Sequence, residues 1–372
     1  MRKLVMFTIV FAMTLATSMN AQEKAKKLKL YGDVRFRTEL DRDSKKNNGD
    51  MRADRDRIRY RFRFGFKYQL NENFDFGGRI RSGNPMNQQS PHVTFGKEFH
   101  SDAFSIDKVY INYKSGGFNM WVGKNSLPIW EPNELLWDGD VNPEGVAMAY
   151  KMKLGDNAKM RLSGGYFIVQ NFYSADGKKQ TFGQHANISM AQAKFCTKIS
   201  DNKLTLAAGM LKAYKLPNKP DGNMTDVMNY TILPFNLQFS MKNGFALGAD
   251  YIMNMEDYKG KVDANYEDQK TGMDFYAKYK INDKWSVKAT YASIQKYAVI
   301  DYYAQDDWVR WGNSNMTRSS NFAGFGVALK YNIAKHFNTQ LKFWNVKGIA
   351  KPTGASALET GTRIRWDFNI KF

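Results

Sequence analysis

The sequence lacks several patterns, and each absence excludes a class of protein. Its single cysteine, Cys196, cannot form an internal disulfide, so a disulfide framework is excluded. After residue 21, no segment approaches the roughly 20 apolar residues of a membrane-spanning helix. Long helical periodicity is absent as well. The histidines are too few and too scattered for a metal site, and we expect no metal or cofactor. They are His92, His100, His185 and His336.

Acidic residues are scarce relative to basic ones. The chain of 372 residues has 36 Asp and Glu against 55 Lys and Arg, a formal net charge of +19. Such an excess can indicate nucleic-acid binding. Here, however, many arginines alternate with aromatic residues in a chain whose N-terminus is typical of exported proteins. We therefore expect no nucleic-acid partner.

The N-terminus has the layout of a secretory signal peptide. Arg2 and Lys3 precede an uncharged apolar run over residues 4–16, and small and polar residues follow up to Ala21. The run is too short to span a membrane as a helix. No cysteine follows it, so a lipoprotein anchor is not supported. We predict a signal peptide at residues 1–21 and one mature domain at residues 22–372.

The last thirteen residues, 360–372, alternate between two kinds of side chain. Trp366 and Phe368 have one parity, and Arg365 and Asp367 have the other, so a strand here has an apolar and a charged face. A chain that ends on an aromatic residue after such a strand resembles the outer-membrane β-barrel proteins of diderm bacteria. The resemblance implies the cell outer membrane as location and the barrel-assembly machinery as a partner, through Phe372. The alternative for this segment is the terminal strand of a soluble sandwich.

The same alternation recurs about sixteen times, mostly over the 9–11 residues that a tilted transmembrane strand needs. The segments are 28–40, 57–70, 74–82, 106–114, 118–124, 146–154, 159–170, 185–199, 203–213, 228–241, 245–254, 269–281, 285–294, 321–331, 337–346 and the terminal one. Short turns rich in Gly, Asn and Asp alternate with long polar loops, as in bacterial outer-membrane barrels. We therefore predict an all-β fold, a transmembrane antiparallel β-barrel of about sixteen strands.

Arginines share one parity in four of these segments. An arginine turned toward lipid at mid-depth costs roughly 2 to 4 kcal/mol, so these side chains are predicted to face the lumen. Barrel closure places the last strand beside the first, which joins the arginines into one basic wall lining the pore. The wall comprises Arg35, Arg37, Arg57, Arg59, Arg61, Arg63, Arg79, Arg81, Arg363 and Arg365. Its mutual repulsion requires carboxylates or mobile anions nearby.

The third long loop, residues 125–145, contains carboxylates and large apolar residues but no basic residue. Here the chain resembles bacterial porins, and more specifically the porins of Bacteroidota. In porins the third extracellular loop folds into the lumen and sets carboxylates against a basic ladder across a constriction. The resemblance implies that role for Trp130, Glu131, Glu134, Trp137, Asp138, Asp140 and Glu144. An ordinary surface loop or a subunit-contact loop is the alternative.

A diffusion pore for small hydrophilic or anionic solutes is the favoured function, and we predict no enzyme. The resemblance to porins also suggests a homotrimer surrounded by outer-membrane lipid and lipopolysaccharide. A barrel enzyme that hydrolyses lipid stays open through one pair, His185 near Ser189, and a pore-less adhesin is a more distant alternative. The basic wall could also serve only to balance acidic residues on a plug or a loop.

Overall fold

The computed structural model describes residues 27–170, 185–217, 229–308 and 320–372. Within these ranges it contains seventeen β-strands and one short 3-10 helix, η1 (Ala264–Tyr266). The strands are β1 (Leu28–Lys45), β2 (Arg55–Gln69), β3 (Phe74–Arg81), β4 (Val93–Thr94), β5 (Ser105–Ser115), β6 (Phe118–Lys124), β7 (Glu144–Lys153), β8 (Ala158–Gln170), β9 (Ala186–Ile199), β10 (Asn202–Tyr214), β11 (Tyr230–Ser240), β12 (Phe245–Asn254), β13 (Thr271–Lys280), β14 (Trp285–Ile294), β15 (Phe322–Ala334), β16 (Phe337–Lys347) and β17 (Thr360–Lys371).

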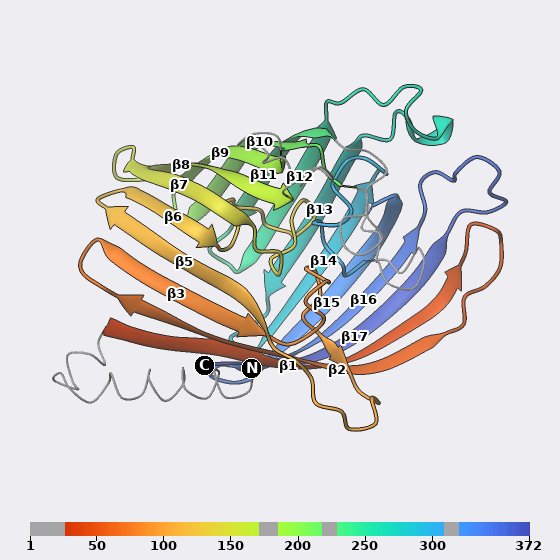
Figure 1. Ribbon diagram of the computed structural model, residues 1–372, viewed down its shortest axis with the longest axis horizontal. Helices are drawn as coiled ribbons and strands as arrows, with labels where there is room; N and C mark the ends of the chain where they lie inside the picture. Colours follow the sequence, from red (N-terminus) through yellow and green to blue (C-terminus); the bar gives the residue numbers. More distant parts are fainter. Residues whose placement is uncertain (1–26, 171–184, 218–228, 309–319) are drawn as a thin grey trace, which may run out of the picture.

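Sixteen of these strands close into an antiparallel barrel (Figure 1). Each strand pairs with the next along the chain, and β17 returns to pair with β1, for example through Arg37 opposite Asp367. The seventeenth strand, β4, has two residues and only extends the edge of β2 beyond the end of β3. The predicted antiparallel barrel of about sixteen strands is therefore confirmed.

The two faces of the barrel differ as the alternation predicts. In β17 the side chain of Trp366 is 49% exposed on the outside, whereas its neighbours Arg365 and Asp367 are 1% and 0% exposed. In β1 Phe36 is exposed and Arg37 is buried. A shift of one residue in register would exchange the two faces, so the pattern fixes the register of these strands.

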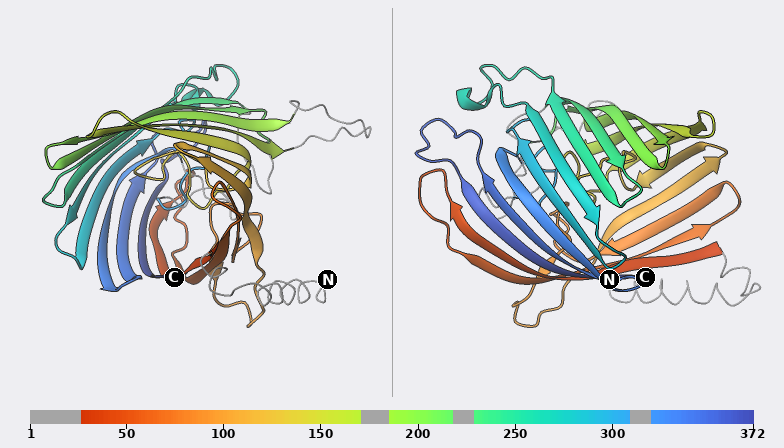
Figure 2. Two further views of the ribbon diagram at one scale, coloured as in Figure 1. Left: turned by 90° about the vertical axis from the view of Figure 1, so that its left-hand side faces the viewer. Right: turned by 180° about the vertical axis from the view of Figure 1, so that it is seen from behind.

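Short and long connections alternate around the barrel, as Figure 2 shows. The turns that follow β2, β5, β7, β9, β11, β13 and β15 are short. Gly116 and Gly155 have φ of 54° and 78° in two of them, a conformation that glycine adopts without a steric penalty. Among the residues that the structure describes, no helix is long and apolar enough to cross a membrane.

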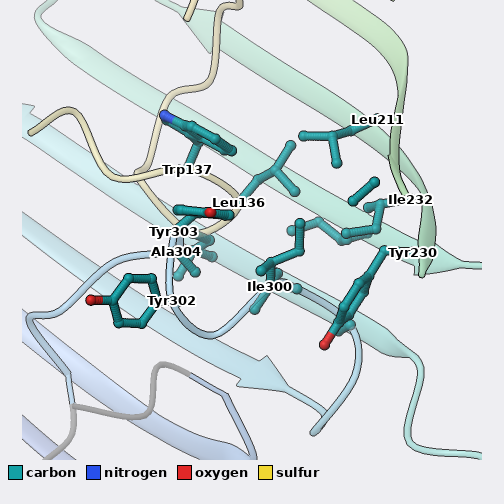
Figure 3. Close-up of a cluster of buried hydrophobic side chains, with 14 of the residues drawn as sticks. Leu136, Trp137, Leu211, Tyr230, Ile232, Ile300, Tyr302, Tyr303 and Ala304 are labelled. Carbon is teal, nitrogen blue, oxygen red and sulfur yellow. The ribbon is translucent and has the colours of Figure 1, made fainter. Parts of the chain in front are cut away.

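Two long loops bury apolar side chains against each other and against the inner wall. Leu136 and Trp137 of the third loop pack with Ile300 and Tyr303, which belong to the loop between β14 and β15. The cluster extends to wall residues such as Leu211 and is shown in Figure 3. Since inward-facing strand residues take part, this cluster lies on the inner side of the sheet.

Candidate functional site

The ten arginines predicted to form the basic wall lie on four consecutive strands, β17, β1, β2 and β3. Their side chains have the inward parity, and six of them are buried rather than open to a lumen. The buried ones are Arg37, Arg59, Arg61, Arg81, Arg363 and Arg365. The structure thus brings the ten predicted residues together. Whether they line a pore depends on which residues cover their side chains.

Carboxylates of the same strands and of the adjacent β5 neutralise much of this wall. Asp33 of β1 accepts from Arg61 and Arg63, with nitrogen–oxygen distances of 2.7 Å in both pairs. Further pairs within the wall follow the same pattern. They are Arg37 with Asp367 at 2.6 Å, Arg365 with Glu39 at 2.6 Å, Arg363 with Asp41 at 2.7 Å, Arg79 with Asp107 at 2.5 Å, and Arg57 with Glu39. Bidentate and charge-assisted contacts of this kind are the strong ones.

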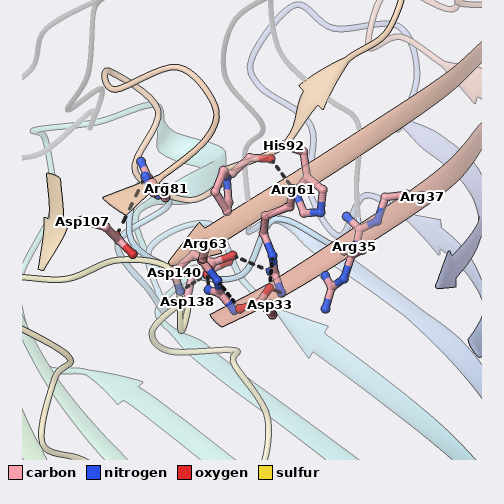
Figure 4. A network of polar contacts seen from close by, with 12 residues as sticks. Asp33, Arg35, Arg37, Arg61, Arg63, Arg81, His92, Asp107, Asp138 and Asp140 are labelled. Atoms are coloured by element: carbon pink, nitrogen blue, oxygen red, sulfur yellow. Dashed lines mark hydrogen bonds and ion pairs between the residues drawn. The ribbon is translucent and has the colours of Figure 1, made fainter. Parts of the chain in front are cut away.

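Among the described residues, Asp140 is the one carboxylate of the third loop that pairs with arginines of the wall. Asp140 contacts Arg63 and lies 3.4 Å from Arg61 (Figure 4). Burial alone would raise the pKa of Asp140, but the guanidinium groups of Arg63 and Arg61 lower it below its usual value. Glu144 does not belong to the loop: it is the first residue of β7 and pairs with Lys124 at 2.8 Å.

A second loop, which the sequence did not single out, covers the other end of the wall. Asp307 pairs with Arg365, and the backbone carbonyls of Asp306 and Asp307 accept from Arg363 at 3.2 and 2.9 Å. Burial alone would raise the pKa of Asp307, but Arg365 and Lys342 lower it. The arginine wall is therefore the surface on which two loops are anchored.

The two loops also bind each other. The rings of Trp137 and Tyr303 stack with centroids 5.1 Å apart, and the backbone amide of Asp138 donates to the carbonyl of Tyr303 at 2.7 Å. Gln89, from the loop after β3, donates through Nε2 to the carbonyl of Ala304 at 2.6 Å. Three loops that are far apart in sequence thus form one packed unit beside the arginine wall.

The other side of the third loop faces the opposite wall. The backbone amide of Trp130 donates to Gln192 of β9 at 2.8 Å, and Gln192 donates back to the carbonyl of Trp130 at 2.8 Å. Asn133 reaches Asp274 of β13 and accepts from Lys288 of β14. The loop segment 130–135 is therefore held against β9, β13 and β14 at these points.

A cavity of about 460 Å³ remains between this segment and strands β13–β16. Glu131 and Glu134 line it from the third loop, Asp307 lines it from the loop after β14, and Asp274, Lys288 and Lys342 line it from the strands. Burial, together with the nearby charges of Asp140 and Asp307, raises the pKa of Glu134 to about 7. Acidic and basic groups thus face each other here, although the basic side consists of lysines and not of the predicted arginines.

In the enzyme alternative, His185 acts with Ser189. The structure places His185 against a tyrosine. His185 Nε2 hydrogen-bonds the hydroxyl of Tyr166 at 2.9 Å. Ser189 lies four residues further along, which corresponds to about 13 Å in a strand. No group of three or more potential metal ligands occurs in the described part of the chain.

A closed sixteen-stranded barrel with loops packed on its inner wall is the architecture of outer-membrane porins. The protein family described as Putative porin matches residues 48–270 of this chain, more than half of its length. The chain therefore belongs to this porin family. No curated protein matches it.

Solved porin structures share the fold at low sequence identity. OmpF of Salmonella typhi, solved in complex with daunomycin, is 12% identical, with 93% of this chain and 97% of that chain covered and a TM-score of 0.56. OprB of Pseudomonas putida is 11% identical, with 95% and 96% covered and a TM-score of 0.57. The outer membrane channel DcaP of Acinetobacter baumannii is 13% identical, with 93% and 97% covered and a TM-score of 0.50. The protein is thus an outer-membrane barrel of the porin class.

Proposed function

We propose that the protein is a diffusion pore whose open path runs between the third loop and strands β13–β16, and that it favours anions. The observation that carries this proposal is a pair of adjoining cavities beside the third loop, the second of which is lined by four lysines and by no carboxylate among the described residues. The arginine wall anchors loops in this proposal and does not line the path, because its side chains are paired and largely buried. This corresponds to the alternative role of the wall considered from the sequence.

The anion preference rests on the second part of this path, because the first cavity is lined by four carboxylates as well as by two lysines. A second cavity of about 510 Å³ adjoins the first and shares Pro132, Lys288 and Gln340 with it. Its lining includes Lys278 and Lys330 but no carboxylate among the described residues. Basic side chains that line a narrow aqueous path raise the local concentration of anions and lower that of cations.

The purified protein is expected to show stepwise ion conductance in a planar lipid bilayer. Across a potassium chloride gradient, the sign of the reversal potential should indicate that chloride permeates better than potassium. A clear cation preference would reject the proposed selectivity, and an absence of stepwise conductance would reject the pore. Lipid hydrolysis that is lost in a His185→Ala variant would instead support the enzyme alternative.

The anion preference is expected to depend on pH through Glu134. Because the pKa of this carboxyl is about 7, the group is largely neutral at pH 5.5 and largely charged at pH 8.5. The added negative charge in the path should lower the anion-to-cation permeability ratio about two- to threefold over this range. The ratio is measured from reversal potentials at both pH values. In E134Q the dependence should be smaller than in the wild type, and an unchanged dependence in E134Q would contradict the assignment.

The remaining sequence predictions belong to the same proposal. Residues 1–21 act as a signal peptide, which lies outside the described residues. Phe372 serves recognition by the barrel-assembly machinery, and the protein forms a homotrimer in contact with lipopolysaccharide. The third loop acts as the constriction through residues 130–135.

A further inference from the structure

Two neighbouring cross-strand rows on the inner face of β13–β16 are rich in lysine. In the first row Lys278 lies directly opposite Lys288, which lies opposite Ala328, which lies opposite Lys342. In the second row Lys280 lies opposite Ser286, which lies opposite Lys330, which lies opposite Gln340. We name these five lysines, Lys278, Lys280, Lys288, Lys330 and Lys342, the lysine rows. They occupy the half of the barrel that is next to the short turns.

The lysine rows bring like charges together, and only some of them have a carboxylate partner: Lys342 pairs with Asp307 at 3.9 Å and with Asp367 at 3.8 Å. Like charges directly opposite in an antiparallel pair destabilise the sheet, and Lys278 and Lys288 are such a pair. Among the described residues, no carboxylate forms an ion pair with Lys278, Lys288 or Lys330. Lys280 has only the exposed Asp283 of the turn, at 2.6 Å. In the arginine wall most arginines pair with strand carboxylates. The contrast indicates that the counter-charge for Lys278 and Lys330 comes from outside the chain.

The surroundings of the lysine rows suit a hydrated anion. The cavity of about 510 Å³ is lined by Lys278, Lys280, Lys288 and Lys330 together with neutral polar side chains. These neutral groups are Gln238, Ser240, Tyr276, Ser286 and Gln340. Hydroxyl and amide groups donate hydrogen bonds to an oxyanion without adding charge.

We propose that the lysine rows bind a phosphate group, either as free phosphate or as the phosphate of a small organic solute. This inference rests on the proposed pore and names the class of anion that binds inside the pore. Neighbouring strands are about 4.8 Å apart and the two rows are separated by about 6.8 Å. A doubly charged oxyanion within this grid accepts hydrogen bonds from several ammonium groups at once. Chloride carries one charge, so its attraction to the same lysines is about half as large.

The test compares conductance in two salts. The full-length protein is inserted in a planar bilayer, and single-channel conductance is measured against concentration in potassium chloride and in potassium phosphate at pH 8. We expect a linear dependence in chloride and saturation in phosphate. In a K278Q/K330Q double variant the half-saturating phosphate concentration should rise about tenfold or more. The same titration with glucose 6-phosphate distinguishes an esterified phosphate from free phosphate, and saturation by either one supports the proposal.

The matched control removes two lysines from short turns at the same end of the barrel, in K242Q/K284Q. This variant loses the same net charge and should keep the wild-type saturation. Absence of saturation with both phosphate compounds, or saturation that is unchanged in K278Q/K330Q, would overturn the proposal. Equal saturation by a dicarboxylate such as malonate would overturn the assignment to phosphate. Cation preference in potassium chloride would instead reject the anion-selective pore, so the two failures are distinguishable.

Discussion

Replacing Arg365 with methionine is expected to lower the free energy of unfolding by about 3–5 kcal/mol, which is the typical cost of removing one partner of a buried ion pair. Arg365 is 1% exposed and pairs with Glu39 and Asp307, and its guanidinium carbon lies 5.4 Å from the ring centroid of Trp344. Methionine retains much of the side-chain volume but none of the charge. Glu39, which is fully buried, then loses one of its charged partners.

Urea titration of the protein in lipid vesicles, followed by tryptophan fluorescence, measures this loss. The control is K242M, because Lys242 pairs with Asp201 at 2.7 Å on the exposed surface of a turn. Exposed pairs of this kind contribute about 1 kcal/mol or less. Equal unfolding midpoints for R365M and K242M would contradict the structural role of Arg365.

The barrel could be predicted from the sequence because its physical cause is local. A strand that separates lipid from an aqueous interior must alternate apolar and polar residues, and this period of two is visible in a single chain. The predicted ends of the strands were less accurate. β1 continues past the predicted end at Leu40 to Lys45, and an irregularity in its pairing separates Arg42 from Lys45. β4 has only two residues, too few to show a period.

The arginine wall was predicted in position but not in its surroundings. Asp33, Glu39 and Asp41 share the parity of Arg35 and Arg37 within β1, so their inward orientation could have been read from the same alternation. These carboxylates, rather than the acidic third loop alone, are the main partners of the arginines.

The contact between the third loop and the loop after β14 could not be predicted. It joins Trp137 to Tyr303 across more than 160 residues, and neither loop has a periodic pattern that would fix its position. Loops of this length take their conformation from tertiary contacts. The cavity beside Glu134 depends on the same packing, so the site on β13–β16 became visible only in the structure.

The packing of Trp137 is expected to control how far the pore is open. Trp137 is buried, stacks on Tyr303 and donates from Nε1 to the carbonyl of Val141 at 3.0 Å. Replacing a buried tryptophan with alanine typically costs about 3–5 kcal/mol. A change of that size shifts an equilibrium between packed and released loops by a factor on the order of 100 or more.

In W137A we therefore expect a larger single-channel conductance and frequent transitions between conductance levels, measured in the same planar bilayers as the wild type. The barrel itself should remain folded, because its strand pairs, including β1 with β17, do not involve this side chain. The matched control is W285A: Trp285 lies on the outer face of β14, partly exposed, and its ring lies 4.5 Å from that of Tyr331 in a tilted pair. This variant also loses a tryptophan–tyrosine contact but does not touch the loops, so its conductance should equal that of the wild type. If folded W137A conducts in uniform steps of wild-type size, the packed loops do not determine the width of the path, and the opening must be set by the segment at Asn133 and its contacts with Asp274 and Lys288.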